Sequence, residues 1–158
     1  MTRTVDLTLT VNGERRVLQV EPFETLLTTL RDRLRLTAAK RGCNQGVCGA
    51  CSVLIGGEPA RACLSLTANC VDSAITTVEG LSTPLALSPL QAAMVSSGAI
   101  QCGFCTPGMV VTLTALLQRR PRPSRDEIRV AVSSNLCRCT GYQKIVDAVV
   151  AVVEQNAA

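Results

Sequence analysis

Arg41-Gly-Cys-Asn-Gln-Gly-Val-Cys-Gly-Ala-Cys51 places three cysteines and three glycines within eleven residues. Because so many glycines disfavour a regular helix or strand, this segment predicts an irregular loop. A fourth cysteine follows after eleven further residues, which gives the spacing C-x4-C-x2-C-x11-C. This spacing is typical of a plant-type [2Fe-2S] site, in which one loop supplies three thiolates. The predicted ligands are Cys43, Cys48, Cys51 and Cys63.

The glycines of this loop support the same interpretation. Backbone N–H donors stabilise the sulfides of a cluster, so the loop must wrap closely without bulky side chains. Gly42, Gly46 and Gly49 permit that close approach. Four thiolates also suit structural zinc, although zinc sites usually combine two separated pairs of closely spaced cysteines. We predict a [2Fe-2S] cluster and keep zinc as the alternative.

A second set of four cysteines lies in the C-terminal half and has the spacing C-x2-C-x31-C-x1-C. Its members are Cys102, Cys105, Cys137 and Cys139. By spacing alone, this set suits a second cluster, zinc, or a thioredoxin-like dithiol in its first pair. The dithiol is disfavoured because the sequence lacks the βαβ pattern around it. Cys70 is left over, and we interpret it as an inert small core residue.

The elements around the first loop are predicted to be mainly strands. Residues 5–11 and 15–20 alternate polar and apolar side chains on either side of Asn12-Gly13, which predicts a β-hairpin. Leucines at helical spacing predict an amphipathic helix over residues 25–34. Beyond the loop, the sequence predicts a second hairpin over residues 52–55 and 58–63, and a fifth strand over residues 74–79.

The pattern becomes helical after residue 88. Residues 81–88 contain Pro84 and show no clear period, so we interpret them as a linker. The predicted helices cover residues 89–97, 107–120, 124–134 and 142–155. Ser124 and Glu127 have the spacing of a capping box. Both cysteine pairs of the second set fall in gaps between helices, and an antiparallel four-helix arrangement would bring these gaps to one end.

The composition excludes several classes of chemistry. The 158 residues include no histidine, which removes Ser-His-Asp catalysis, Cys-His nucleophiles and His-ligated haem or Rieske centres. The N-terminus lacks the apolar core of a signal peptide, and no apolar run approaches the roughly 20 residues that cross a bilayer. We therefore expect a cytoplasmic chain without a membrane span, in which cysteines bind metal and do not form disulfides.

Arginine clusters carry the formal charge of +4 and raise the question of nucleic acid. Only three aromatic side chains, Phe23, Phe104 and Tyr142, are available to stack on bases, and no nucleic-acid motif is visible. We predict no nucleic-acid partner. The clusters are better explained as solvated faces or as contacts with acidic partner surfaces.

Three motifs together resemble the small iron-sulfur subunit of the molybdenum hydroxylases, the family of xanthine dehydrogenase, aldehyde oxidoreductase and carbon monoxide dehydrogenase. They are residues 41–51, Gln101-Cys-Gly-Phe-Cys-Thr-Pro-Gly-Met109 and Asn135-Leu-Cys-Arg-Cys-Thr-Gly-Tyr142. The resemblance covers nearly the whole chain and implies that the second site is also a [2Fe-2S] cluster. It implies an α+β fold with a plant-ferredoxin-like (β-grasp) domain in residues 1–80, a linker in 81–88, and an all-α four-helix domain in 89–158.

The resemblance also implies a function in electron transfer, with no catalytic residue in this chain. In the family, a large subunit carries molybdopterin, expected in its cytosine dinucleotide form, and hydroxylates substrate with oxygen from water. A medium subunit carries FAD, and we expect a dimer of heterotrimers. Gln101 and Cys139 would approach the pterin, so electrons would pass from the second cluster to the first and then to FAD.

The chain departs from the family pattern at two positions that are not predicted ligands. Family members often have histidine where this chain has Ser97, and glycine where it has Ser134. The departures concern the cofactor-facing surface. The substrate is selected in the large subunit, so this sequence does not indicate it. Two other functions stay open, a free-standing ferredoxin and a zinc-stapled interaction module.

Overall fold

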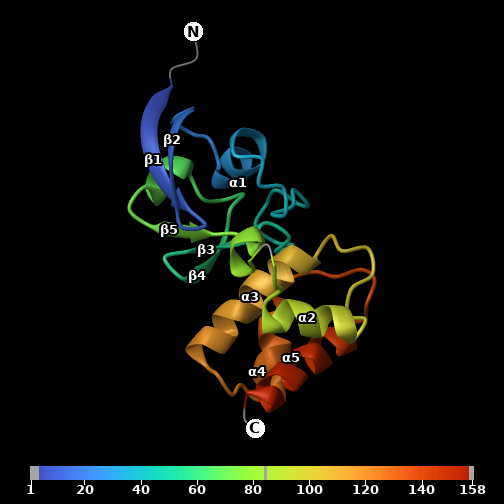
Figure 1. The fold of residues 1–158 in the computed structure, drawn as a ribbon. Coiled ribbons are helices and arrows are strands. Elements are labelled where there is room, and N and C mark those ends of the chain that lie inside the picture. The colour runs from blue at the N-terminus through green and yellow to red at the C-terminus, as the bar shows by residue number, and fades with distance from the viewer. Residues whose placement is uncertain (1–3, 84, 157–158) are drawn as a thin grey trace.

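The structure is a computed structural model that describes residues 4–83 and 85–156. Its ribbon has a strand-rich part coloured blue to green and a helical part coloured yellow to red (Figure 1). One five-stranded mixed sheet has the order β2-β1-β5-β3-β4. The strands are β1 (Val5–Val11), β2 (Glu14–Val20), β3 (Ser52–Ile55), β4 (Glu58–Arg61) and β5 (Ala74–Thr76). The fold is therefore α+β.

Both predicted hairpins are confirmed. β1 pairs antiparallel with β2, and β3 pairs antiparallel with β4. The first turn has positive φ at both Asn12 (51°) and Gly13 (81°), which is the backbone of a two-residue turn that matches strand twist. β5 joins the hairpins, running parallel to β1 and antiparallel to β3.

The fifth strand is shorter than predicted. It ends at Thr76, and residues Val78–Leu81 form a 3-10 turn, η3. The reason lies in Asn12, whose Oδ1 accepts the Thr77 N–H at 2.9 Å. This side-chain bond takes the donor that a neighbouring strand would otherwise use.

The helix predicted over residues 25–34 is split. A short α1 (Leu26–Thr28) continues into a π-helical turn, η1 (Thr29–Arg33), in which the Leu34 N–H donates to the Thr29 carbonyl at 3.0 Å. Leucine spacing does not distinguish these two hydrogen-bond patterns. Leu26, Leu27 and Leu30 are buried against the sheet, as an amphipathic element requires.

Four α-helices follow residue 88, and each agrees with its predicted range to within one residue. They are α2 (Pro89–Ser96), α3 (Thr106–Arg119), α4 (Arg125–Ser133) and α5 (Gln143–Gln155). Capping boxes at Ser88 and Ser124 start α2 and α4. α2 packs on α5, and α4 contacts both α3 and α5. Met94, Met109 and Ile145 are among the side chains buried between these helices.

The helical part also packs on the sheet. Helix α3 lies against β3, where Leu54 shares a small buried cluster with Val111 and Ala115 (Figure 1). The cysteine-bearing loops of the two parts therefore lie near one boundary. Within the described residues, none of the helices has the length and hydrophobicity that crossing a bilayer requires.

Candidate metal centres

The first cysteine set is built by an irregular loop and one hairpin. Cys43 and Cys48 lie in the segment between η1 and β3, which has neither helix nor strand. Cys51 precedes β3 and Cys63 follows β4, so the antiparallel pairing of these strands brings both cysteines to one end of the hairpin. The Ala62 N–H donates to the Cys51 carbonyl at 3.3 Å and closes that end.

Backbone N–H groups point at the sulfurs of the loop. Cys43 Sγ accepts from the N–H groups of Cys48 (3.3 Å) and Gln45 (3.4 Å), and Cys48 Sγ accepts from the Cys43 N–H at 3.4 Å. The Cys48 and Gln45 donors lower the pKa of Cys43 to about 6. Burial has the opposite effect on Cys51 and raises its pKa to about 11. A metal would therefore compete with a proton more strongly at Cys51 than at Cys43.

The loop wraps these thiols too closely for side chains at two of its glycines. A Cβ on Gly42 would lie 2.9 Å from Cys48 Sγ, and a Cβ on Gly46 would lie 2.3 Å from Leu64 Cδ1. Thiolates, inward N–H donors and a close-fitting backbone form the kind of cradle that a [2Fe-2S] cluster needs.

The second set comes together where the α2–α3 and α4–α5 loops meet. Cys139 Sγ lies 3.5 Å from Cys102 Sγ, although 36 residues separate the two cysteines in the sequence. Cys137 is buried, and Cys102 and Cys139 are exposed. The predicted convergence of these two loops is confirmed.

The pKa values of Cys105 and Cys137 in this set are shifted in opposite directions. Burial, reinforced by its neighbour Cys137, raises the pKa of Cys105 to about 12. Burial would also raise the pKa of Cys137, but the Thr140 hydroxyl and the backbone N–H groups of Cys139 and Thr140 lower it to about 7. Tyr142 supports this loop, because its hydroxyl accepts the Cys137 N–H at 2.7 Å. As in the first set, a stabilised thiolate lies beside a buried thiol.

In residues 4–83 and 85–156, no three Cys, Asp or Glu side chains converge closely enough to hold a single metal ion. Four thiolates could serve either tetrahedral zinc or a [2Fe-2S] cluster, in which each iron takes two ligands from the protein.

Comparison with known proteins agrees with this geometry. Residues 9–97 match the 2Fe-2S iron-sulfur cluster binding domain family, and residues 77–150 match the [2Fe-2S] binding domain family. The nicotinate dehydrogenase small FeS subunit of Eubacterium barkeri is 46% identical over 97% of this chain and 98% of its own length. The nicotine 6-hydroxylase small subunit of Paenarthrobacter nicotinovorans is 50% identical over 92% of this chain and 87% of its own length. This chain belongs to the small iron-sulfur subunits of the molybdenum hydroxylases.

The solved structures support the same family membership. Quinoline 2-oxidoreductase from Pseudomonas putida 86 contains a chain that superposes with a TM-score of 0.93 at 47% identity. The match covers 98% of this chain and 96% of that one. The family resemblance of the three sequence motifs is thereby confirmed.

Within this iron-sulfur subunit, the sequence did not reveal how the two cysteine sets are connected. The buried Asn135 donates from Nδ2 to the Gly49 carbonyl at 2.8 Å, and the Leu136 N–H donates to the Cys48 carbonyl at 2.9 Å. Arg61 also donates to the Ser134 carbonyl. The one sequence feature that could have indicated these residues is their position, since Asn135 and Arg61 each lie two residues before a cysteine.

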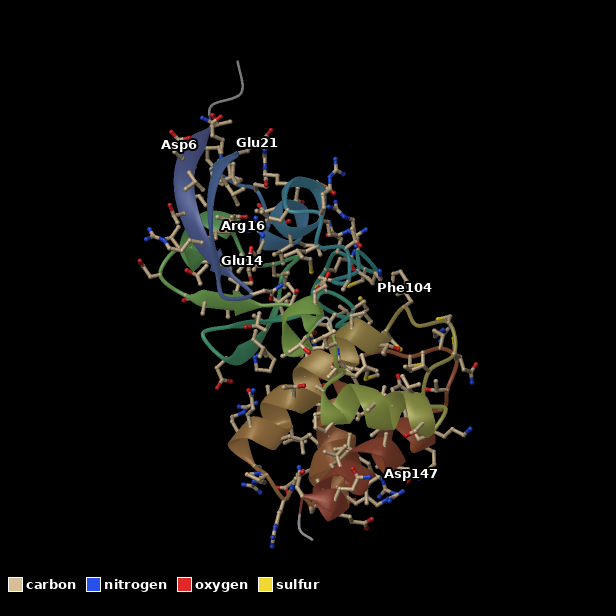
Figure 2. All side chains as sticks on the ribbon, in the orientation of Figure 1. Asp6, Glu14, Arg16, Glu21, Phe104 and Asp147 are labelled. Carbon is tan, nitrogen blue, oxygen red and sulfur yellow. The ribbon has the colours of Figure 1, made fainter. Side chains whose placement is uncertain are left out.

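Phe104 is another residue that lies beside a cysteine loop other than its own. It belongs to the second motif, yet a Cβ on Gly42 would lie 3.6 Å from Phe104 Cε1. Figure 2 shows Phe104 at the boundary between the two parts of this iron-sulfur subunit. Phe104, a residue that is 47% exposed, therefore lies beside the first loop as well as in the second.

Proposed function

We propose that the chain is the electron-transfer subunit of a heteromeric molybdenum hydroxylase and holds two [2Fe-2S] clusters. The first cluster would be held by Cys43, Cys48, Cys51 and Cys63, and the second by Cys102, Cys105, Cys137 and Cys139. The observation that carries the proposal is the presence of two complete thiol sets in adjoining loops. When bound, each cluster accepts and releases one electron.

The chain's own residues have three tasks in this proposal. The thiolates bind iron, the N–H groups of Gln45 and Cys48 stabilise negative charge on sulfur, and Tyr142 holds the second loop. No residue of this chain is assigned acid-base or nucleophilic work. The absence of histidine supports that assignment.

The proposed domains are a plant-ferredoxin-like domain (1–80), a linker (81–88) and an all-α four-helix domain (89–158). The order of strands followed by helices supports this division. The buried hydrophobic contact of Leu54 with Val111 and Ala115 joins the two proposed domains across their boundary. They therefore differ in secondary structure but are packed against each other.

The proposed partners are a large molybdopterin subunit and a medium FAD subunit, assembled in the cytoplasm as a dimer of heterotrimers. The large subunit would carry the cytosine dinucleotide form and hydroxylate substrate with oxygen from water. Gln101 and Cys139 are exposed at the end of the helical part, which supports their proposed place near the pterin. Electrons would enter there and leave through the first cluster to FAD. The names of the two relatives, each a small subunit, support a larger assembly.

The test is anaerobic purification of the tagged chain from its native host. We expect about four iron and four labile sulfide per chain, two EPR signals on reduction, and co-purifying molybdopterin and FAD subunits. Zinc in place of iron, or a monomeric native pool with intact clusters, would contradict the proposal. The first result would indicate an interaction module and the second a free-standing ferredoxin.

A matched pair of variants tests the ligand assignment. Cys63 and Cys70 are both buried, and the sequence interpretation makes only Cys63 a ligand. Cys63→Ser should therefore remove one EPR signal and stop reduction of FAD by substrate, while the second cluster is still reduced. Cys70→Ala should retain both signals and the full iron content. Loss of a cluster in Cys70→Ala, or retention of both in Cys63→Ser, would show that the ligands are assigned wrongly.

A further inference from the structure

One hydrogen bond connects the two cysteine loops directly. The Leu136 N–H donates to the Cys48 carbonyl at 2.9 Å. Cys48 belongs to the first thiol set, and Leu136 immediately precedes Cys137 of the second set. One hydrogen bond therefore joins the carbonyl of Cys48 to the backbone that leads directly into Cys137.

A buried amide next to this bond fixes the two loops against each other. The Asn135 side chain belongs to a residue only 1% exposed, and its Nδ2 donates to the Gly49 carbonyl at 2.8 Å. Its Oδ1 accepts from the Thr112 hydroxyl at 3.0 Å and from the Ser134 hydroxyl at 2.9 Å. With donors and acceptor both engaged, the amide has one satisfied orientation.

The backbone segments around this amide pack closely. Gly49 has a φ of +73°, and a Cβ there would lie 2.6 Å from Asn135 Nδ2. On the other side, a Cβ on Gly108 of α3 would lie 2.4 Å from the Gly49 carbonyl oxygen. Arg61 holds the same region by donating to the Ser52 hydroxyl and the Ser134 carbonyl. Two loops, one strand end and one helix therefore meet around the Asn135 amide.

We propose that Asn135 is a positioning residue for electron transfer between the two clusters. Its amide holds the Gly49 carbonyl, and thereby keeps the neighbouring Cys48 carbonyl in hydrogen-bond contact with the Leu136 N–H. With both clusters bound, one electron would pass from the cluster held at Cys137 to the cluster held at Cys48, with no covalent bond or proton transferred. The inference rests on the proposed function, because it requires both clusters.

The experiment compares Asn135→Ala with Thr112→Val in the complete, cluster-loaded complex. Asn135→Ala removes the contact to Gly49, whereas Thr112→Val removes one bond to the same amide and leaves that contact in place. Hydrogen exchange of the Leu136 amide reports the bond between the loops. EPR of the fully reduced complex reports the magnetic interaction between the clusters, and flash reduction reports the rate of transfer between them.

We expect Asn135→Ala to retain both EPR signals while the Leu136 amide exchanges about tenfold faster, as loss of roughly one hydrogen bond's stability implies. The magnetic interaction should change and transfer between clusters should slow, with KM for substrate unchanged. Thr112→Val should alter these readouts less. Equal changes in both variants, or unchanged readouts in Asn135→Ala, would overturn the inference.

The unmodified complex provides a test that needs no variant. Its Leu136 amide should be protected from exchange, and exchange at the rate of an exposed amide would overturn the inference even if Asn135→Ala does not fold. If the unmodified complex lacks a second cluster, the proposed function fails. If it has both clusters and Leu136 is unprotected, only the role of Asn135 fails.

Discussion

Each thiol set contains one cysteine with a lowered pKa and one with a raised pKa. Backbone donors lower the pKa of Cys43 to about 6, while burial raises that of Cys51 to about 11. Cys137 and Cys105 repeat the contrast, at about 7 and about 12. Each set therefore pairs a thiol that loses its proton readily with one that holds its proton more tightly. In each site the fold thus favours the thiolate form of one cysteine, while burial disfavours the charged form of another.

Glu24 is a residue outside the two thiol sets whose charge supports the fold. Its side chain is 6% exposed and accepts from the Thr29 hydroxyl at 2.6 Å and from Arg33 Nε at 2.7 Å. Glu24→Gln should lower the free energy of unfolding at pH 7 by about 1–2 kcal/mol, discounted for the partial exposure of Arg33. Urea unfolding of the anaerobic protein measures this difference.

The same pair predicts a pH dependence. The hydrogen bond from Arg33 lowers the pKa of Glu24 below 4.5, against the opposing effect of burial. Because the pKa of Glu24 is lower in the folded state than in the unfolded state, its ionised form stabilises the fold at pH values above the unfolded-state pKa. This stabilisation is lost as the pH falls through the folded-state pKa. The difference between wild type and Glu24→Gln should thus shrink below pH 4.5. Glu14→Gln is the control, because Glu14 and Arg16 are mostly exposed and their pair contributes less than about 0.5 kcal/mol (Figure 2). A constant Glu24 difference at all pH values would contradict this explanation.

At the scale of elements, local chemistry made much of the fold predictable. The turn at Asn12-Gly13 needs residues that accept positive φ, and the capping box at Ser124 fixes where α4 begins. Both signals lie within a few residues, so the sequence alone reveals them. The end of β5 was predicted wrongly because Asn12, which lies 65 residues away from Thr77, takes its N–H.

The cysteine sets show the same division between local and distant information. Spacing predicted which thiols meet, and Cys102 does lie beside Cys139. Spacing carried no information about the contact of Asn135 with Gly49, since it depends on how α3 packs against β3. Contacts between elements that are far apart in the sequence follow from packing, and one sequence does not specify them by any local pattern.

Gly49 provides a test of the loop as an element. Gly49→Ala combines a positive φ with a Cβ 2.6 Å from Asn135 Nδ2 and 2.7 Å from the Ser134 carbonyl oxygen. We expect a loss of about 3 kcal/mol or more in unfolding free energy, because strain and a clash with backbone add. Gly56→Ala is the matched control, with a φ of +60° and nothing within 4 Å of the added Cβ. It should cost only about 1–2 kcal/mol. Equal losses in the two variants would show that the Asn135 contact is unimportant for stability.

Across the whole molecule, charge and packing connect the two parts. The chain has a formal charge of +4, and each oxidised [2Fe-2S] centre with four thiolates carries about −2. Two proposed clusters would therefore offset the charge of the chain. The shared cluster of Leu54, Val111 and Ala115 and the Asn135 contact should make the parts unfold together.

Removal of iron tests whether the clusters also hold this structure together. Residues 41–51 and 134–142 have no helix or strand, so their own hydrogen bonds stabilise them little. Chelation under anaerobic conditions should abolish visible absorption and lower Tm by roughly 10 °C, as the loss of several kcal/mol of cluster binding implies. Hydrogen exchange should rise first in these two segments, whereas the amides of β1 and α5 should stay protected. Reconstitution with iron and sulfide should restore Tm and colour, and zinc alone should not. An iron-free chain with unchanged Tm and loop protection would show that the loops are already rigid, and the clusters would then contribute nothing to the stability of the fold.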